Sequence, residues 1–271
     1  MLESYLFIPG NKENYFNKIS SLNPDFFVID LEDAVSSNNR KSAYELIMKF
    51  KFPPTTYVRI PIMEKCFNND EMATLIRKFN GQIIFPKISY SKDLEILISL
   101  VPSDIILKLI LLVENPKCYM NLENILTENL DVIQGIGFGS HDFCSSLGMK
   151  HESKYIDHYK KQIIVICRAF EVRFVDTVDL NFNKIDSFKQ DCINSFNLGA
   201  DGKFIIHPNQ LKAINEASYL SEQEIENYSN LLIHINNISD EDIDVIEFNG
   251  EIYEKPHIQK IRKMLKKIKN I

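Results

Sequence analysis

The stretch FFVIDLEDAV, residues 26–35, joins a strongly apolar run to a cluster of acidic residues. The apolar part is typical of a strand that is buried on both faces. Asp30, Glu32 and Asp33 follow it closely. Because neighbouring carboxylates repel one another and are costly to bury, this cluster requires a positively charged partner. The stretch therefore predicts a buried strand whose carboxyl end carries chemistry.

Seven further apolar runs of strand length occur along the chain, and the segments between them have the spacing of amphipathic helices, for example residues 154–170. Eight strands that alternate with helices predict an α/β protein, a parallel (β/α)₈ TIM barrel. An open doubly wound sheet is the alternative. Its nucleotide-binding form is disfavoured, because no G-x-G-x-x-G motif opens a helix. The seven runs are SYLFIP (4–9), TYVRIP (56–61), GQIIFPKI (81–88), LKLILLVEN (107–115), VIQGIGFGS (132–140), RFVDTVDL (173–180) and GKFIIHP (202–208).

The composition disfavours several classes of protein. The 271 residues suffice for one barrel, and a net charge of -6 without a basic arm gives no reason to expect nucleic acid as a partner. The opening residues lack the pattern of a signal peptide, and no run reaches the roughly 18 apolar residues that a membrane span requires. Five scattered cysteines without a C-x-x-C pair favour a reduced cytoplasm, and they disfavour zinc and a disulfide framework.

The carboxyl-terminal part differs from the repeated pattern. Residues 1–235 are expected to form the barrel, and residues 236–271 a lid and oligomerisation segment that begins with a polar linker, residues 236–245. The segment continues with a hairpin-like piece, VIEFNGEIYEKP (245–256), and a basic amphipathic helix. One face of that helix is apolar, and we expect it to pack on a neighbouring subunit rather than on a membrane surface. The residues of that face are Ile258, Ile261, Leu265 and Ile268.

Barrel enzymes place their chemistry at the carboxyl ends of the strands, so the charged residues at these ends are the candidate site residues. For Asp30, Asp176, Lys87 and Lys203, ion-paired networks that fill the barrel are an equally good explanation. The remaining charged residues or histidines at or near strand ends are Glu32, Asp33, Arg59, Glu114, His141, Asp142, Asp179 and His207.

A metal site is predicted from four of these residues. Glu32, Asp33, Glu114 and Asp142 come late on their strands or just beyond them. Four clustered carboxylates cannot all be ionised without a cation. Because the set offers only oxygen ligands, it suits Mg²⁺ or Mn²⁺ better than zinc.

Three other motifs have simpler explanations. The alternating glycines of GIGFGS (135–140) favour close packing inside the barrel over a phosphate cradle. A hydrolase triad within Ser140, His141 and Asp142 is rejected, because a triad is assembled from spatial neighbours and no G-x-S-x-G motif is present. His207 is interpreted as a structural histidine.

Taken together, these motifs resemble the citrate lyase beta-subunit family, within the aldolase and malyl-CoA lyase group. The resemblance covers nearly the whole chain. DLEDAV, PK and GKFIIHPNQ, in this order and spacing, are its most specific parts. The matching segments are SYLFIPG (4–10), VIDLEDAV (28–35), YVRI (57–60), IIFPKI (83–88), LLVEN (111–115), GIGFGSHDF (135–143), LGADGKFIIHPNQL (198–211) and NGEIYEKP (249–256).

The resemblance implies a (β/α)₈ barrel with a carboxyl-terminal lid, assembled as a homotrimer or hexamer. It implies reversible, Mg²⁺-dependent carbon–carbon cleavage of a 3-hydroxyacyl-CoA, such as citryl-, malyl- or citramalyl-CoA, into an acyl-CoA and a 2-keto acid. By the same resemblance, Glu114 and Asp142 match the direct metal ligands, and Glu32 and Asp33 match acids that hold the metal's water molecules.

The resemblance also assigns substrate-facing residues. Arg59 matches an arginine that faces the substrate carboxylate or thioester oxygen, and Lys87 and Lys117 fall where substrate anions are bound. Glu254 stands where the family has an aspartate that acts as acid/base in a neighbouring subunit's site. The chain departs from the family at Glu3, where an arginine is usual.

Further departures occur at Lys117, where an arginine is usual, at His141, where an acid is usual, and at Pro61. Because Glu3 and Lys117 fall where CoA or substrate anions would be bound, two other functions stay open. One is a metal-dependent aldolase of free 2-keto acids without CoA, and the other is a non-catalytic paralogue.

Overall fold

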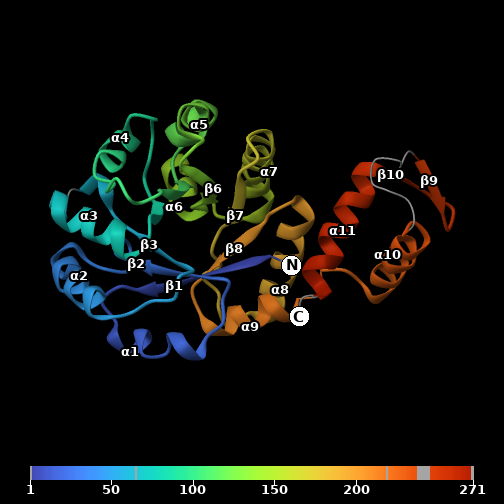
Figure 1. Ribbon diagram of the computed structural model, residues 1–271, viewed down its shortest axis with the longest axis horizontal. Helices are drawn as coiled ribbons and strands as arrows, with labels where there is room; N and C mark the ends of the chain where they lie inside the picture. Colours follow the sequence, from blue (N-terminus) through green and yellow to red (C-terminus); the bar gives the residue numbers. More distant parts are fainter. Residues whose placement is uncertain (1, 65, 218, 237–244, 270–271) are drawn as a thin grey trace. The chain divides into compact units, whose positions relative to one another are not determined.

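The computed structural model describes residues 2–64, 66–217, 219–236 and 245–269. Its first eight strands pair in sequence order, all parallel, and the last pairs with the first, so that they form a closed barrel (Figure 1). The prediction of a (β/α)₈ barrel is therefore confirmed, and the open sheet is excluded. The strands are β1 (Glu3–Pro9), β2 (Phe26–Asp30), β3 (Thr56–Arg59), β4 (Gln82–Phe85), β5 (Lys108–Val113), β6 (Ile133–Phe138), β7 (Arg173–Asp176) and β8 (Gly202–Ile205).

The helices begin and end at residues that suit a helix end, either a side chain that caps the free backbone groups or a glycine that reverses the backbone. The Asn68 side chain and Glu71 form a capping box at the start of α3. Gly148 and Gly199 end α6 and α8 in the left-handed conformation that glycine tolerates. The helices of the barrel are α1 (Glu13–Phe16), α2 (Arg40–Lys49), α3 (Asn69–Lys78), α4 (Asp93–Ile98), α5 (Pro116–Asn129), α6 (Ser140–Leu147), α7 (Ser153–Ala169), α8 (Ile185–Leu198) and α9 (Pro208–Glu216).

The barrel interior is filled by apolar side chains from most of its strands. Gly137 is required there, because a Cβ atom on it would lie 2.5 Å from Leu112 Cδ2 and 2.7 Å from Phe204 Cε2. This contact confirms close packing for the middle glycine of GIGFGS. The cluster comprises Tyr5, Val28, Tyr57, Ile84, Ile110, Leu112, Val175 and Phe204.

A buried ionic network lies on the outer side of the barrel, between its strands and helices. Asp176 of β7 accepts hydrogen bonds from Lys203 of β8, at 3.0 Å, and from Lys160 of α7, also at 3.0 Å. Burial alone would raise the pKa of Asp176, but the two ammonium groups hold it below its ordinary value. The pairing of Asp176 with Lys203 is thus confirmed. The expectation that this pair fills the barrel interior was wrong, because both side chains point toward helices.

The chain divides into two compact units, residues 2–216 and residues 217–271. The second unit contains α10 (Glu222–His234), the antiparallel strands β9 (Val245–Phe248) and β10 (Glu251–Glu254), and α11 (Lys255–Lys269). We expected the boundary at residue 236. The helix α10 instead belongs with the tail, because its Leu231 packs in one apolar cluster with the tail's Tyr253 and Ile258.

The same cluster corrects the expectation for the apolar face of α11. Ile258, Ile261 and Leu265 are buried against α10 and the hairpin of their own chain, so a neighbouring subunit is not needed to cover them. The side chain of Ile268 and most of the expected polar linker, residues 236–245, lie outside the described residues.

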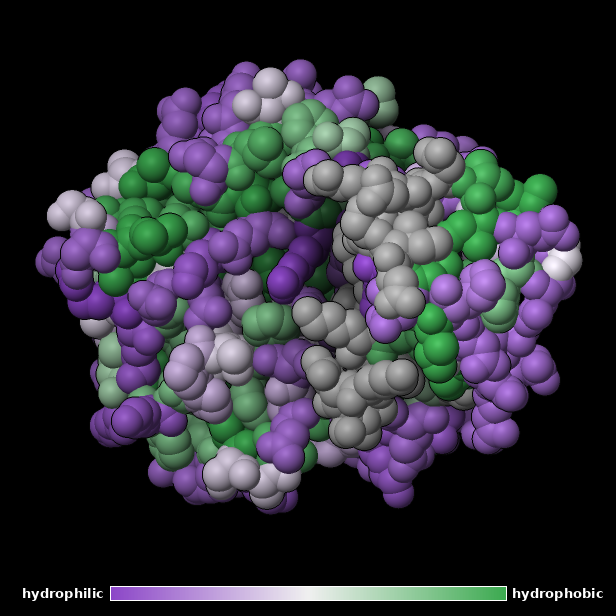
Figure 2. All heavy atoms as spheres, turned by 45° about the vertical axis from the view of Figure 1, so that its right-hand side comes forward, coloured by the Kyte–Doolittle hydropathy of each residue, from purple (hydrophilic) through white to green (hydrophobic). Residues whose placement is uncertain are grey.

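The surface carries hydrophilic and hydrophobic side chains side by side (Figure 2). Within the described ranges, no helix has both the length and the apolar character that a membrane span requires.

Candidate functional site

A cavity of about 100 Å³ lies at the carboxyl ends of the barrel strands. It brings together Asp33, Arg59, Glu114 and Asp142, to which the sequence assigned roles in the site, and His141, which the sequence placed near a strand end. Its other lining residues are Phe7, Leu112, Phe138, Gly139, Ser140, Thr177, Val178 and Phe204.

Arg59 is held rigidly by Asp30. Its Nε donates to Asp30 Oδ1 at 2.8 Å and its Nη2 to Asp30 Oδ2 at 2.6 Å, across the adjacent strands β2 and β3. The Phe7 ring lies 4.9 Å from the guanidinium carbon. Burial alone would lower the pKa of Arg59, but the charge of Asp30 raises it, so the group stays a cation. This two-point contact fixes the direction in which the third nitrogen, Nη1, is presented.

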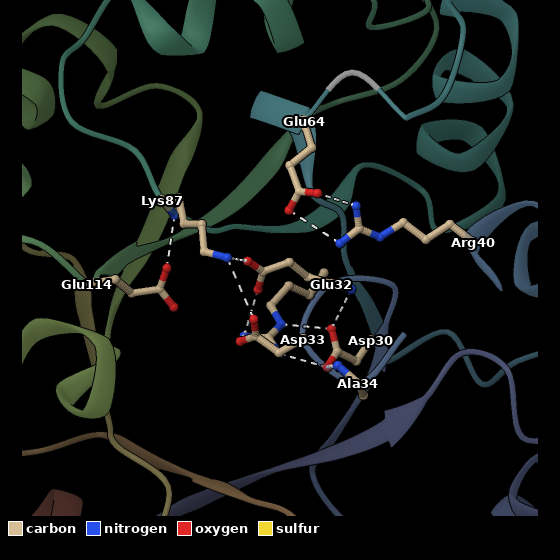
Figure 3. A network of polar contacts seen from close by, with 9 residues as sticks. Asp30, Glu32, Asp33, Ala34, Arg40, Glu64, Lys87 and Glu114 are labelled. Atoms are coloured by element: carbon tan, nitrogen blue, oxygen red, sulfur yellow. Dashed lines mark hydrogen bonds and ion pairs between the residues drawn. The ribbon is translucent and has the colours of Figure 1, made fainter. Parts of the chain in front are cut away.

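That third nitrogen contacts the acidic cluster. Arg59 Nη1 lies 3.1 Å from Glu32 Oε2 and 3.1 Å from Asp33 Oδ2. Lys87 contacts the same two carboxylates, with its Nζ against Glu32 and 3.6 Å from Asp33 Oδ1 (Figure 3). In this structure, Arg59 and Lys87 are therefore the positive partners that the DLED sequence requires.

Glu32 is the most deeply buried acid of the cluster. It is 1% exposed, and burial raises its pKa in spite of the two cations. Each of its carboxylate oxygens faces a cation, with Oε2 3.1 Å from Arg59 Nη1 and Oε1 against Lys87 Nζ. A buried carboxylate between two cations depends on positive charge beside it, which a hydrated metal ion could also supply.

Lys87 has a left-handed backbone, with φ of 56°. This conformation is uncommon for a residue other than glycine, asparagine or aspartate, and such residues are enriched at functional sites. Its backbone N–H donates to Glu114 Oε2 at 2.9 Å, while its side chain points toward Glu32 (Figure 3). Lys87 thus connects Glu114 to the acidic cluster through two different groups.

Glu114 follows β5 directly and is nearly buried. The next residue, Asn115, accepts a hydrogen bond from the Cys118 N–H at 2.9 Å and so caps α5, which begins at Pro116. Gly139 leaves room for the carboxylate, because a Cβ atom there would lie 2.8 Å from Glu114 Oε1. Burial, together with the charges of Glu32 and Asp142, raises the pKa of Glu114 to about 8.

Asp142 lies in the first turn of α6 and is exposed. Negative charge is favourable at this end of a helix. The neighbouring His141 stacks on His151, with ring centroids 3.7 Å apart, and burial lowers the pKa of both rings. Ser140 Oγ contacts His151 Nε2 at 2.8 Å, so its histidine partner is not the neighbour that the SHD sequence offers.

Sequence reasoning missed several residues around the cavity. Phe7, Ser140 and Thr177 line it, and His151 supports it through Ser140. Ser140 Oγ also contacts Thr177 Oγ1 at 2.6 Å. A weak signal exists for Phe7 alone, because it sits near the end of the first apolar run. His151 lies in the loop between α6 and α7, and no pattern in the sequence connects it with the site.

The donor set fits a magnesium ion that retains water ligands. Over the part of the chain that the structure describes, no three histidine, cysteine, aspartate or glutamate side chains are gathered as a complete metal cage. Mg²⁺ does not require one, since it commonly binds through one or two carboxylates and keeps several waters. Glu114 and Asp142 face one cavity, and Asp142 is one of the charges that raise the Glu114 pKa. A divalent cation would relieve that repulsion.

Lys117 and Glu254, two further predicted site residues, are not among the residues that line the cavity. Lys117 is exposed in the first turn of α5, next to Glu114 in sequence. Glu254 is exposed at the end of β10, in the second compact unit, and its N–H donates to His257 Nδ1 at 3.2 Å. The structure leaves their functional roles as predictions.

Glu3 lies at the amino end of the barrel, opposite the cavity. Its carboxylate accepts hydrogen bonds from Arg173 at 3.1 Å and Tyr5 Oη at 3.2 Å. The expectation that Glu3 alters the substrate site was therefore wrong, because this residue opens β1 whereas the cavity lies at the strands' carboxyl ends.

Comparison with known proteins places the chain among barrel enzymes of related chemistry. Residues 3–208 match the family model described as HpcH/HpaI aldolase/citrate lyase. The chain is 27% identical to a (3S)-malyl-CoA thioesterase of Cereibacter sphaeroides, over 99% of this chain and 95% of that protein. It is 26% identical to the mitochondrial citramalyl-CoA lyase of Homo sapiens, over 82% of this chain and 72% of that protein.

The fold is shared with a solved structure of CitE from Mycobacterium tuberculosis in complex with magnesium, acetoacetate and coenzyme A. The TM-score is 0.78 at 20% identity, and the match covers 98% of this chain and 97% of that one.

Proposed function

The chain belongs to the HpcH/HpaI aldolase/citrate lyase family, and from that premise we propose that it is a Mg²⁺-dependent carbon–carbon lyase. Its substrate is a 3-hydroxyacyl-CoA of the citryl-, malyl- or citramalyl-CoA type, which it cleaves into, or forms from, an acyl-CoA and a 2-keto acid. The observation that carries this proposal is a cavity at the barrel's carboxyl end, where Glu114, Asp142 and Arg59 converge.

The names of related proteins support this substrate class. Two curated relatives are named for malyl-CoA and citramalyl-CoA, and the CitE structure contains magnesium, a keto acid and coenzyme A. Malyl-CoA and citramalyl-CoA are anionic hydroxy acids that are joined to coenzyme A through a thioester. A cavity that combines one fixed guanidinium with three carboxylates is suited to bind such an anion together with a divalent cation.

The chain's own residues have distinct roles in this proposal. When bound, Mg²⁺, or Mn²⁺ in its place, supplies Lewis acidity at the substrate hydroxyl and its neighbouring oxygens. Glu114 and Asp142 hold the ion, and Glu32 and Asp33 hold its water molecules. The guanidinium of Arg59, which lines the cavity, supplies a fixed positive charge near the oxygen on which negative charge develops, a contact of the kind whose removal costs about 3 kcal/mol.

The remaining residues transfer the proton and bind the anionic groups of the substrate. Glu254 carries the proton between the substrate hydroxyl and solvent, from the tail of a neighbouring subunit in a homotrimer or hexamer. Lys87 and Lys117 bind substrate anions at the mouth. Two observations support these roles. Glu254 is exposed at the end of its hairpin, and Lys117 stands in the helical turn that follows Glu114.

A second candidate is an aldolase that acts on free 2-keto acids without CoA. The small cavity, about 100 Å³, favours it, because a short keto acid could fill this space by itself. The metal and Arg59 would stabilise the enolate of such an acid equally well.

One experiment separates the two candidates. The purified chain is incubated with citramalyl-, malyl- and citryl-CoA, with Mg²⁺ or EDTA, and mass spectrometry follows the acyl-CoA and keto acid products. We expect Mg²⁺-dependent cleavage of at least one thioester and its loss in Glu114→Gln and Asp142→Asn. Cleavage of none, combined with Mg²⁺-dependent exchange of pyruvate methyl protons with deuterium, would favour the aldolase. Activity that survives in both variants contradicts the metal assignment.

A further inference from the structure

The Lys87 ammonium contacts Glu32 and Asp33, the two carboxylates that are expected to interact with a bound metal ion. We propose that this ammonium group neutralises Glu32 and Asp33 in the metal-free protein, and that a divalent cation bound at Glu114 and Asp142 displaces it from them. The inference rests on the proposed metal site. It goes further, because it assigns Lys87 as an internal competitor that lowers the affinity for the metal.

The two cations of the cluster differ in how firmly they are held. The Arg59 side chain is 11% exposed and is bound by both oxygens of Asp30, so it cannot leave without exposing a buried carboxylate. The Lys87 side chain is 45% exposed and ends in a single ammonium on a flexible stem. When a second cation arrives, Lys87 is therefore the partner that can move into water.

The backbone of Lys87 allows its side chain to leave without disturbing Glu114. The hydrogen bond to Glu114 Oε2, at 2.9 Å, comes from the main-chain N–H of Lys87 and is independent of its ammonium group. The left-handed conformation, with φ of 56°, directs that N–H toward Glu114 while the side chain points toward Glu32. Displacement of the ammonium would thus leave the orientation of the proposed metal ligand intact.

The balance of charges around Glu32 and Asp33 predicts whether Lys87 raises or lowers the affinity for the metal ion. Glu32 and Asp33 are already contacted by Arg59, and Lys87 adds a second positive charge to the same pair. A metal ion whose water molecules bind these carboxylates must displace the Lys87 ammonium or be repelled by it. Because such coupling is reciprocal, removing the ammonium should raise the metal affinity, by about tenfold for one partly exposed charge pair.

The displaced ammonium also gains a role. Once released from Glu32, which Arg59 also contacts, the ammonium would be free to meet a substrate carboxylate or thioester oxygen that approaches Arg59. The metal would then make Lys87 available as a substrate-binding residue, which orders the events as metal first and substrate second.

The first test measures Mn²⁺ and Mg²⁺ affinity by calorimetry, without substrate. Lys87→Gln should bind either ion about tenfold more tightly than the wild type, and Lys87→Arg, which keeps the charge, should remain close to it. Lys117→Gln removes an equal charge from the turn after Glu114 and should change the affinity much less. Equal or weaker binding by Lys87→Gln would overturn the proposal. Lys87→Asn, which suits a left-handed backbone, gives the same comparison if Lys87→Gln does not fold.

The second test follows the wild-type amine directly. Brief acetylation with and without Mn²⁺, followed by peptide mass spectrometry, should show several-fold faster modification of Lys87 when the ion is present and an unchanged rate at Lys117. A Lys87 rate that is unchanged or slowed by a bound ion refutes the displacement while leaving the metal site standing. If calorimetry detects no ion binding by the wild type, the metal site itself fails, and the inference fails with it.

Discussion

At the scale of single residues, Glu114 combines deep burial with two acidic neighbours. Its pKa is raised to about 8, so it binds a proton in the folded state under conditions in which the unfolded chain does not. Between its ordinary value of 4.5 and about 8, the folded state holds the extra proton, and stability therefore falls as the pH rises through this window. Below the window both states are protonated, and above it both are ionised.

This titration predicts how Glu114→Gln affects stability. In EDTA, the variant should be more stable than the wild type at pH 8.5, by a few kcal/mol at most, because the amide cannot ionise. The difference should shrink toward pH 5. Urea unfolding at several pH values measures it. A difference that does not change with pH would show that the carboxyl group has an ordinary pKa in the folded protein.

Arg59 gives a second prediction at this scale. Asp30 binds Nε and Nη2 of Arg59, so only a planar guanidinium can hold Asp30 and still present a third nitrogen to Glu32 and Asp33. Arg59→Lys should lower turnover by roughly one to three orders of magnitude, the scale of a lost oxyanion donor. Steady-state kinetics with a cleaved thioester would check this. A wild-type rate would remove Arg59 from the mechanism.

At the scale of elements, the site depends on how β6 passes into α6. Gly139 stands at this junction and lies so close to Glu114 that a Cβ atom would be 2.3 Å from its Cγ. Gly139→Ala should therefore push Glu114 out of place and weaken Mg²⁺ binding at least tenfold, the scale seen when groups that orient a metal ligand are lost. Gly148→Ala is a suitable control, because nothing lies within 4 Å of its added methyl group and only the helix end is strained. Equal metal affinity of the two variants would contradict this assignment.

The elements also explain what the sequence could predict. The eight apolar runs identified all eight strands, because a strand buried on both faces requires continuous apolar residues, and the strand ends then identified Arg59, Glu114 and Asp142. The contact of His151 with Ser140 could not be predicted, because His151 lies in a loop, where the sequence has no periodicity. The left-handed backbone of Lys87 could not be predicted either, because lysine has no preference for that conformation. The division at residue 217 followed from contacts of Leu231 that a linear pattern does not show.

At the scale of the whole molecule, the proposed acid/base residue lies in a different compact unit from the metal site. We predict that Glu254 serves a neighbouring subunit. Glu254→Gln should keep metal binding but lose turnover, because an amide cannot carry the proton.

A mixing experiment tests whether Glu254 acts in a neighbouring subunit. When Glu254→Gln protein is mixed with inactive Arg59→Ala protein under conditions of subunit exchange, part of the activity should return. Demonstrated exchange without recovery would place Glu254 at its own barrel or outside the reaction. Glu251→Gln, on the same strand, is the matched control.

The pairing of Arg59 and Lys87 with the DLED acids also bears on how the protein matures. Many small metalloproteins remain unfolded until their ion arrives, so that ion supply limits their synthesis. Here the chain carries its own counter-charges for Glu32 and Asp33, and the barrel around them is held by an apolar interior. A newly made molecule can therefore complete its fold without the ion. Under the proposed function, its turnover would then follow the local magnesium concentration, whereas its folding would not.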